Sequence, residues 1–265
     1  MDTFELMPKR SHPFVPCFFR TLCILGLLFP GSLLAQEFDY VGKPSPPKTR
    51  QDFSQDVTRV ELSGQFAIPR GQLGSKNVIA QESGFAKEGG SGSISADYKF
   101  NQIFGIGIKG GYGLLPADVA LLEEIYGIVD TNLVDFTAGS WNFRNVQVFG
   151  VIEYQVEQAD FFFRFGAGIF GSRSPRIESV YQYPTATISL LEEGQFGSAP
   201  ALNFALGSRL YIGDVFLSIT GEATFSRHDV TVVVSQTGFT GTGQYSYTQD
   251  VALYRFGLGI GMRLQ

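Results

Sequence analysis

The residues that could carry acid–base catalysis are few. Ser226 and His228 stand two positions apart, and residues two apart on a strand share a face. A histidine beside a serine hydroxyl could act as general base for that nucleophile, as in hydrolases. No further motif frames the pair, and one serine near one histidine is common by chance. The sequence therefore predicts no catalytic residue.

A second set of reactive groups consists of charged residues inside otherwise uncharged, alternating segments. Both signs occur, and a buried charge persists only when it is paired. We expect these residues to form a charge network in the lumen of a barrel: Glu61, Asp97, Lys99, Lys109, Glu153, Arg164, Arg209, Glu222 and Arg255. Two interpretations stay open. The network neutralises itself and closes the lumen, or its pairs exchange partners and gate an ion path.

Metal and cofactor chemistry finds little support in the sequence. Both cysteines, Cys17 and Cys23, fall in an N-terminal signal, which leaves no thiol for a disulfide, a nucleophile or a metal. The Gly-x-Gly strings alternate within strands instead of preceding a helix, so they indicate space in a narrow lumen and not a nucleotide site. No Walker-type sequence or clustered His/Cys set is present, and we predict neither a metal nor a cofactor.

The N-terminus has the features of an export signal. Lys9, Arg10 and Arg20 precede an apolar run at 21–29, and Ser-Leu-Leu-Ala at 32–35 resembles a cleavage site. The run is shorter than the about 20 residues that a spanning helix needs. Cleavage after residue 35 removes three of 20 basic and two of 25 acidic residues, so the mature net charge is −6. That mild acidity offers no footprint for nucleic acid.

The elements that would position the charged residues are strands. Eight segments alternate apolar and polar residues at period two, and about ten residues suffice to cross a bilayer at a tilt. The predicted strands are residues 57–68, 92–100, 103–112, 143–154, 161–170, 201–212, 215–225 and 251–264.

The connections between these strands alternate in length. Short ones are expected at 101–102, 157–160 and 213–214, and long ones at 70–90, 114–142, 172–199 and 228–249. This alternation is typical of a transmembrane β-barrel with tight periplasmic turns and long extracellular loops. An even strand number closes such a barrel without a free edge, as hydrocarbon requires. Charged residues make up only 17% of the chain, whereas a soluble surface usually has roughly 25–35%.

Alternation alone does not say which face is inside. A soluble, lipocalin-like barrel has an apolar interior and the same period. Here the apolar faces are bulky and nearly uncharged, and the opposite faces are rich in Gly and Ser. These features favour a barrel with its apolar side outward, and an exported soluble carrier remains the alternative.

Three glycine-alternating repeats carry a resemblance to a known family. They are Phe104-Gly-Ile-Gly-Ile-Lys109, Phe163-Arg-Phe-Gly-Ala-Gly-Ile169 and Tyr254-Arg-Phe-Gly-Leu-Gly-Ile-Gly-Met262. Residues 57–265 resemble the small eight-stranded outer-membrane barrels of the OmpA-like and opacity-protein-like superfamily. The resemblance implies an all-β, antiparallel, up-and-down barrel in the bacterial outer membrane, with outer-membrane lipid and the assembly machinery as partners. Many such proteins end in an aromatic residue, whereas this chain ends Arg263-Leu264-Gln265.

The predicted organisation is a signal peptide at 1–35, a Pro-rich periplasmic segment at 36–56 and the barrel at 57–265. Residues 116–126 are predicted to form a short helix in the second long loop, with proline near its start. The last hairpin is expected to extend beyond the membrane. Loops usually carry the specificity of such barrels. The predicted contacts for a surface ligand or protein are aromatic: Tyr181, Tyr183, Phe239, Tyr245 and Tyr247.

These features predict a non-enzymatic outer-membrane protein with a structural or surface-interaction role carried by its extracellular loops. The first alternative is a narrow, porin-like channel for ions or small solutes. The second is a lipid-modifying hydrolase at the barrel rim that uses Ser226 and His228.

Overall fold

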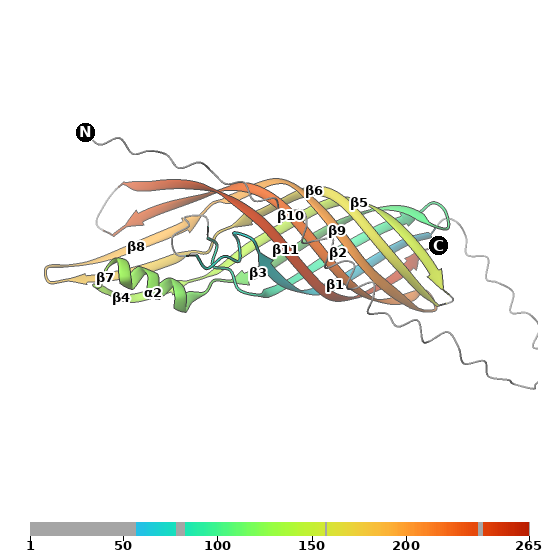
Figure 1. The fold of residues 1–265 in the computed structure, drawn as a ribbon, viewed down its shortest axis with the longest axis horizontal. Coiled ribbons are helices and arrows are strands. Elements are labelled where there is room, and N and C mark those ends of the chain that lie inside the picture. The colour runs from blue at the N-terminus through green and yellow to red at the C-terminus, as the bar shows by residue number, and fades with distance from the viewer. Residues whose placement is uncertain (1–56, 78–82, 157, 238–240, 265) are drawn as a thin grey trace, which may run out of the picture. The chain divides into compact units, whose positions relative to one another are not determined.

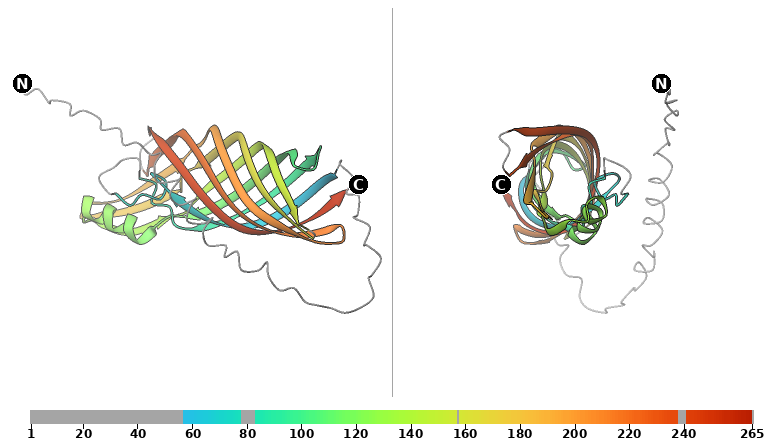
Figure 2. Two further views of the ribbon diagram at one scale, coloured as in Figure 1. Left: turned by 45° about the vertical axis from the view of Figure 1, so that its right-hand side comes forward. Right: turned by 90° about the vertical axis from the view of Figure 1, so that its left-hand side faces the viewer.

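The computed structural model describes residues 57–77, 83–156, 158–237 and 241–264. The predicted signal peptide and Pro-rich segment lie outside the described residues. Eight strands form a closed antiparallel ring, because β11 pairs with β10 on one side and with β1 on the other. The view along the axis in Figure 2 shows this ring. In ring order the strands are β1 (Val57–Arg70), β2 (Gly89–Lys99), β3 (Phe104–Pro116), β5 (Ser140–Val156), β6 (Ala159–Arg173), β9 (Phe196–Ile212), β10 (Val215–Gln236) and β11 (Thr242–Leu264).

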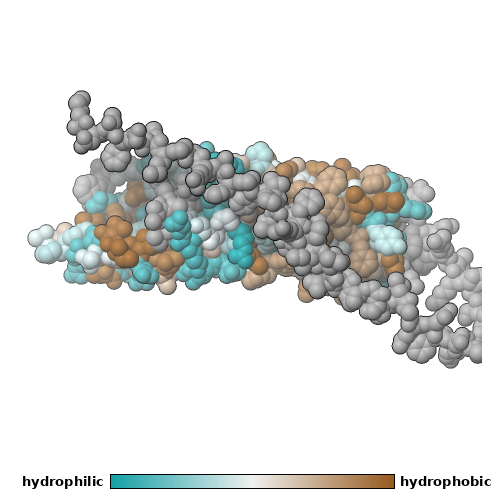
Figure 3. Space-filling view, in the orientation of Figure 1, coloured by the Kyte–Doolittle hydropathy of each residue, from teal (hydrophilic) through white to brown (hydrophobic). Residues whose placement is uncertain are grey.

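The apolar face of every ring strand points outward. Leu258 is 67% exposed, whereas Arg255, three residues earlier on the same strand, is fully buried. The outward side chains form an apolar belt, visible as the brown half of Figure 3. Its members include Leu62, Phe66, Ile94, Ile106, Ile108, Val146, Val148, Phe163, Phe165, Leu202, Leu206, Leu217, Ile219, Leu258, Ile260 and Met262. An apolar exterior around a polar interior is the pattern of a transmembrane β-barrel, so the lipocalin-like alternative is wrong.

One end of the ring, the turn end, carries the short connections. Gly213 has a φ of +66°, a conformation that glycine adopts without steric strain, and it joins β9 to β10 as predicted. Asn101 closes another turn, where its Oδ1 accepts the backbone N–H groups of Ile103 and Phe104. Asp160 was expected in a turn, but it belongs to β6 and is buried in the lumen.

The opposite end, the loop end, is more ordered than the sequence suggests. Residues 172–199, predicted as a loop, contain a hairpin of β7 (Ile177–Tyr183) and β8 (Ala186–Gly194). Strand β8 pairs with the end of β10, and β7 pairs with β4 (Leu133–Ala138). We call β4, β7, β8 and the parts of β10 and β11 from residues 226–236 and 242–251 the loop-end sheet (Figure 1). The predicted extension of the last hairpin is thereby confirmed.

A single helix is present among the described residues, and it packs on the loop-end sheet. It is α2 (Val119–Val129), so the helix predicted at 116–126 starts three residues later, after Pro116 has ended β3. Leu122 is its buried residue and joins Phe136 of β4 in an apolar cluster, where the Tyr126 and Phe136 rings lie 5.1 Å apart. No helix of the described residues is long and apolar enough to cross a membrane.

Candidate functional site: the lumen and the loop-end pocket

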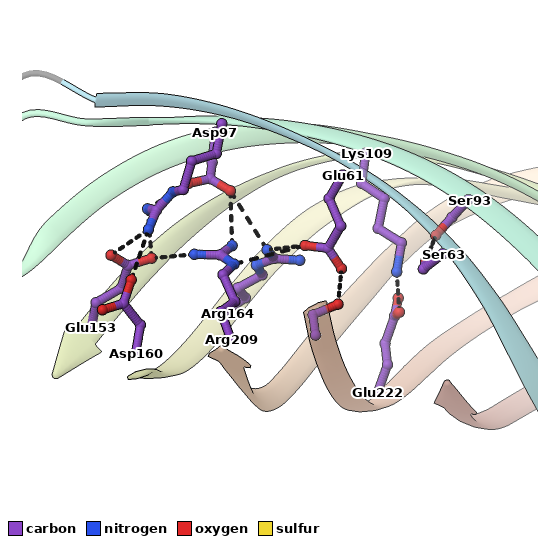
Figure 4. Close-up of polar contacts among 12 residues, drawn as sticks. Glu61, Ser63, Ser93, Asp97, Lys109, Glu153, Asp160, Arg164, Arg209 and Glu222 are labelled. Carbon is purple, nitrogen blue, oxygen red and sulfur yellow. Dashed lines mark hydrogen bonds and ion pairs between the residues drawn. The ribbon is translucent and has the colours of Figure 1, made fainter. Parts of the chain in front are cut away.

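Charged side chains fill the lumen near the turn end (Figure 4). Arg59 of β1 lies 2.6 Å from both Asp97 of β2 and Glu153 of β5. Arg209 of β9 reaches the same two carboxylates at 2.9 and 2.6 Å. Asp160 accepts a 2.5 Å hydrogen bond from the Tyr211 hydroxyl. Since five strands, β1, β2, β5, β6 and β9, supply these groups, the cluster bridges the ring from side to side.

Arg164, Glu61 and Phe162 continue this cluster away from the turn end. The Arg164 guanidinium donates to Glu61 at 3.0 Å, and Ser218 donates to the same carboxylate at 2.8 Å. Arg164 and Arg209 also lie over the Phe162 ring, at 4.4 and 4.6 Å from its centroid. Such cation–π contacts become stronger when water is excluded.

A second charge cluster is centred on Glu222 of β10. Its carboxylate pairs with Lys109 and with Arg255, the latter at 2.6 Å. Asn203 donates to it at 2.6 Å, and Gln65 donates at 3.2 Å. Every side chain in this group is buried, and among the described residues Glu222 is the only carboxylate that pairs with Lys109 or with Arg255.

All nine residues predicted for the network are buried in the lumen. Two further members were missed. Arg59 lies on the predicted polar face of the first strand, so the same alternation could have identified it. Asp160 was missed because residues 157–160 have the composition of a turn. The described lumen therefore holds five carboxylates and six cationic groups: Glu61, Asp97, Glu153, Asp160 and Glu222 against Arg59, Lys99, Lys109, Arg164, Arg209 and Arg255.

An apolar layer closes the lumen at the loop end. Trp141 and Phe143 of β5, Phe170 of β6, Leu115 of β3 and Leu253 of β11 are at most 2% exposed. They belong to one cluster, in which the Phe143 and Phe170 rings stack at 5.8 Å. We call this cluster the apolar plug. The lumen is thus filled in series by the turn-end charges, the Glu222 cluster and the plug.

The serine–histidine pair of the hydrolase alternative does not form. His228 is buried, and its Nε2 lies 2.7 Å from the Ser172 hydroxyl, while Ser226 donates to the Pro200 carbonyl oxygen. The Ser172–His228 pair has hydrogen-bond geometry, but Ser172 is only 1% exposed and lies beside the plug. A lipid acyl group therefore has no open approach to it in this conformation.

The predicted aromatic loop contacts divide into distinct groups. Tyr181 was predicted as a partner contact, but it is only 6% exposed, so its side chain offers little surface in this conformation. The Tyr183 hydroxyl binds the Asp130 carboxylate, which lowers the pKa of Asp130. Tyr245 and Tyr247 stack at 6.3 Å on β11. Phe239 lies outside the described residues.

Tyr245 and Tyr247 line a cavity of about 310 Å³ between α2 and the loop-end sheet, the loop-end pocket. The sequence did not suggest it, because its walls come from separate segments: Ser83, Gly84, Phe85, Leu122, Ile125, Tyr126, Trp141, Ser174, Pro175, Ile177, Glu192, Val232, Tyr245 and Tyr247. The Tyr126 and Tyr245 hydroxyls donate to the two oxygens of Glu192 at 2.8 and 3.0 Å. Burial, together with the charge of Glu192, raises the pKa of the Tyr126 hydroxyl.

Asp118 fixes the segment before α2. Its carboxylate pairs with Lys76 at 2.7 Å and Lys87 at 2.8 Å, and the hydrogen bonds from these ammonium groups lower the pKa of Asp118. No cluster of His, Cys, Asp and Glu suited to a metal occurs in the described part of the chain.

No protein-family model matches the sequence, and no curated protein does. Solved structures do show similarity. A major outer membrane protein from Thermus thermophilus is 12% identical with a TM-score of 0.46, covering 78% of this chain and 99% of its own. The outer membrane protein OprG from Pseudomonas aeruginosa is 8% identical with a TM-score of 0.44, over 79% and 96% of the chains. Neisserial surface protein A is 10% identical with a TM-score of 0.43, over 78% and 97%. This chain is thus similar to small outer-membrane β-barrels.

Proposed function

We propose that this protein is a non-enzymatic barrel of the bacterial outer membrane that binds a surface ligand or protein through its loop end. The export signal predicted at 1–35, with cleavage after Ala35, and the apolar belt support this location. In that orientation the short turns face the periplasm and the loop-end sheet faces the cell exterior.

The observation that carries the proposal is the contrast between the two ends of the barrel. The lumen is filled by paired charges and by the apolar plug, which leaves little room for solute. The loop end instead builds a second layer of ordered structure from four connections that a purely structural barrel could keep short. Ordered structure of this extent is better explained by a binding role than by anchoring alone.

Three surface features support binding at the loop end. Ile128 and Val129 at the end of α2 and Val134 at the start of β4 are 74%, 80% and 59% exposed. A brown patch over the α2 region in Figure 3 lies apart from the belt. Within the described residues, β4 and the outer part of β11 also leave one strand edge unpaired, and such edges can accept a partner strand.

The proposal is tested first by SDS gel mobility and planar-bilayer recording. A closed barrel resists cold SDS and changes mobility on boiling, and we expect that shift together with no steady conductance. Recovery as a soluble protein without a shift would reject the membrane location. A steady ohmic conductance from the wild-type protein would favour the narrow-channel alternative.

A further inference from the structure

We propose that the loop-end pocket binds a small organic ammonium cation, held by Glu192 and by the surrounding aromatic rings. This inference rests on the proposed function, because it names a ligand class for the part of the protein to which binding is assigned. The volume of about 310 Å³ is at the lower end of the range for small-molecule sites.

The charge of the pocket favours a cationic ligand. Glu192 is the only ionisable acid or base other than tyrosine among the described lining residues. Its oxygens accept hydrogen bonds from Tyr126 and Tyr245, and it makes no ion pair with any residue that the structure describes. The neighbouring Glu193, by contrast, pairs with Arg173. An anionic ligand would therefore be repelled, and a neutral one would leave the charge of Glu192 without a counter-ion.

The walls of the pocket select an organic cation over a metal ion. Tyr126, Trp141, Tyr245 and Tyr247 contribute aromatic rings, whose faces attract alkylated ammonium groups. Leu122, Ile125 and Val232 add apolar surface for the body of the ligand. A hard metal ion instead needs about six to eight oxygen ligands, and one carboxylate engaged by two tyrosines does not supply them.

An unused polar atom marks a further contact point. Ser174 lines the pocket and is 7% exposed as a residue, and its buried hydroxyl has no hydrogen-bond partner among the described residues. Buried hydroxyls are normally satisfied, so a ligand hydroxyl that reached this oxygen would supply its missing partner. A cation that carries a hydroxyl a short distance from its ammonium group therefore matches the pocket best.

Trp141 provides the readout, because it is the only tryptophan of the chain and it lines the pocket. The full-length mature protein, folded in detergent micelles, is titrated with choline chloride and, separately, with its uncharged isostere 3,3-dimethyl-1-butanol. We expect a saturable change in Trp141 fluorescence with choline, and binding of the isostere at least about tenfold weaker. Sodium chloride at equal ionic strength corrects for salt.

Variants separate the pocket from its surroundings. Glu192→Gln keeps the shape and an acceptor for the tyrosine hydroxyls but removes the charge, so we expect choline affinity to fall about tenfold. Glu193→Gln changes the adjacent carboxylate, which pairs with Arg173 and does not line the pocket, and should bind choline as the wild type does. Tyr247→Leu removes a ring that makes no hydrogen bond to Glu192 among the described contacts, and it should also weaken binding.

The outcomes distinguish this inference from the proposed function. Every variant is first checked for the cold-SDS mobility of the folded barrel. No saturable response, equal binding of choline and its isostere, or unchanged binding by folded Glu192→Gln would overturn the inference and leave the barrel assignment intact. Failure of the wild type to show the mobility shift would instead reject the proposed function, whatever the fluorescence shows.

Discussion

Replacing Glu222 by glutamine should destabilise the barrel strongly, because it leaves two buried cations without an anion. Glu222 lies 2.6 Å from Arg255 and also pairs with Lys109, and all three side chains are nearly inaccessible. At an effective dielectric constant of about 20, one such pair attracts by about 6 kcal/mol, and desolvation of both groups offsets part of this. Removing one partner of a buried pair typically lowers stability by about 3–5 kcal/mol. We expect Glu222→Gln to fall in that range.

The assay is urea unfolding of the protein in detergent micelles, followed by the fraction of the compact form in cold SDS gels. The urea midpoint should fall while the slope stays constant, since the same surface is exposed on unfolding. Glu178→Gln is the matched control, because its carboxylate is half exposed and 3.9 Å from Arg176, and an exposed pair is worth less than about 1 kcal/mol. Adding Lys109→Met to Glu222→Gln should recover part of the loss. Equal effects of Glu222→Gln and Glu178→Gln would refute the view that the lumen charges are desolvated.

Three further predictions concern the lumen and the loop end. Glu222→Ala should leave bilayer conductance unchanged, because the turn-end charges and the apolar plug still close the lumen in series; a clear rise would identify a gating pair. Gly107→Ala should lower the free energy of unfolding, measured by urea, by about 1–3 kcal/mol, since its added carbon would lie 2.6 Å from the Ala96 carbonyl oxygen and closer still to the Phe149 ring, whereas Gly64→Ala on the open outer face should not. The lowered pKa of Asp118 means that its ion pairs stabilise the loop end fully above about pH 4, the unfolded value, and that this contribution is lost as pH falls through the folded pKa. Hydrogen exchange at the Lys87 amide, which donates to Pro116, should therefore accelerate at acidic pH relative to Asp118→Asn, which should show no such step.

The barrel could be predicted from the sequence because the membrane imposes a simple rule on each strand. One face must be apolar and the other must fit a narrow interior, so period-two alternation predicted all eight strands, and the bulky, nearly uncharged apolar faces opposite Gly- and Ser-rich ones predicted which side lies outward. The strand predicted at 143–154 has apolar residues on both faces, and it still follows the rule: Phe149 and Val151 point inward, where they pack with Phe162. The nine network residues could be named for the same reason, since each interrupts an otherwise uncharged strand on its inner face.

The loop end could not be predicted in this way, because no lipid acts on it. Strand β8 is half exposed along most of its length, and the buried face of β7 includes a polar residue, Ser179, so residues 177–194 show no clean apolar alternation and resemble a loop. Strand β7 pairs with β4 and β8, and β8 pairs with β10, which lies much further along the chain. The loop-end pocket is harder to predict, because Glu192 is recognised as part of a site only once the fold brings Tyr126 and Tyr245 into hydrogen-bond contact with it. Asp160 shows the same limit inside the barrel, because its contacts with Arg59 and Tyr211 of other strands are what identify it as a lumen residue.

Closure of the lumen and the binding proposed at the loop end meet at Trp141. Its ring belongs to the apolar plug and also lines the loop-end pocket, and its indole N–H donates to the Gly84 carbonyl at 2.8 Å. That hydrogen bond links β5 to the segment before β2. Trp141, which separates the pocket from the lumen, is therefore held both by this bond and by its packing in the plug. A ligand in the pocket would therefore rest on a closed floor, without a path into the barrel. This arrangement fits a surface receptor whose barrel serves as a rigid support, and it is poorly suited to a transporter, which needs a continuous passage from the same pocket through the lumen.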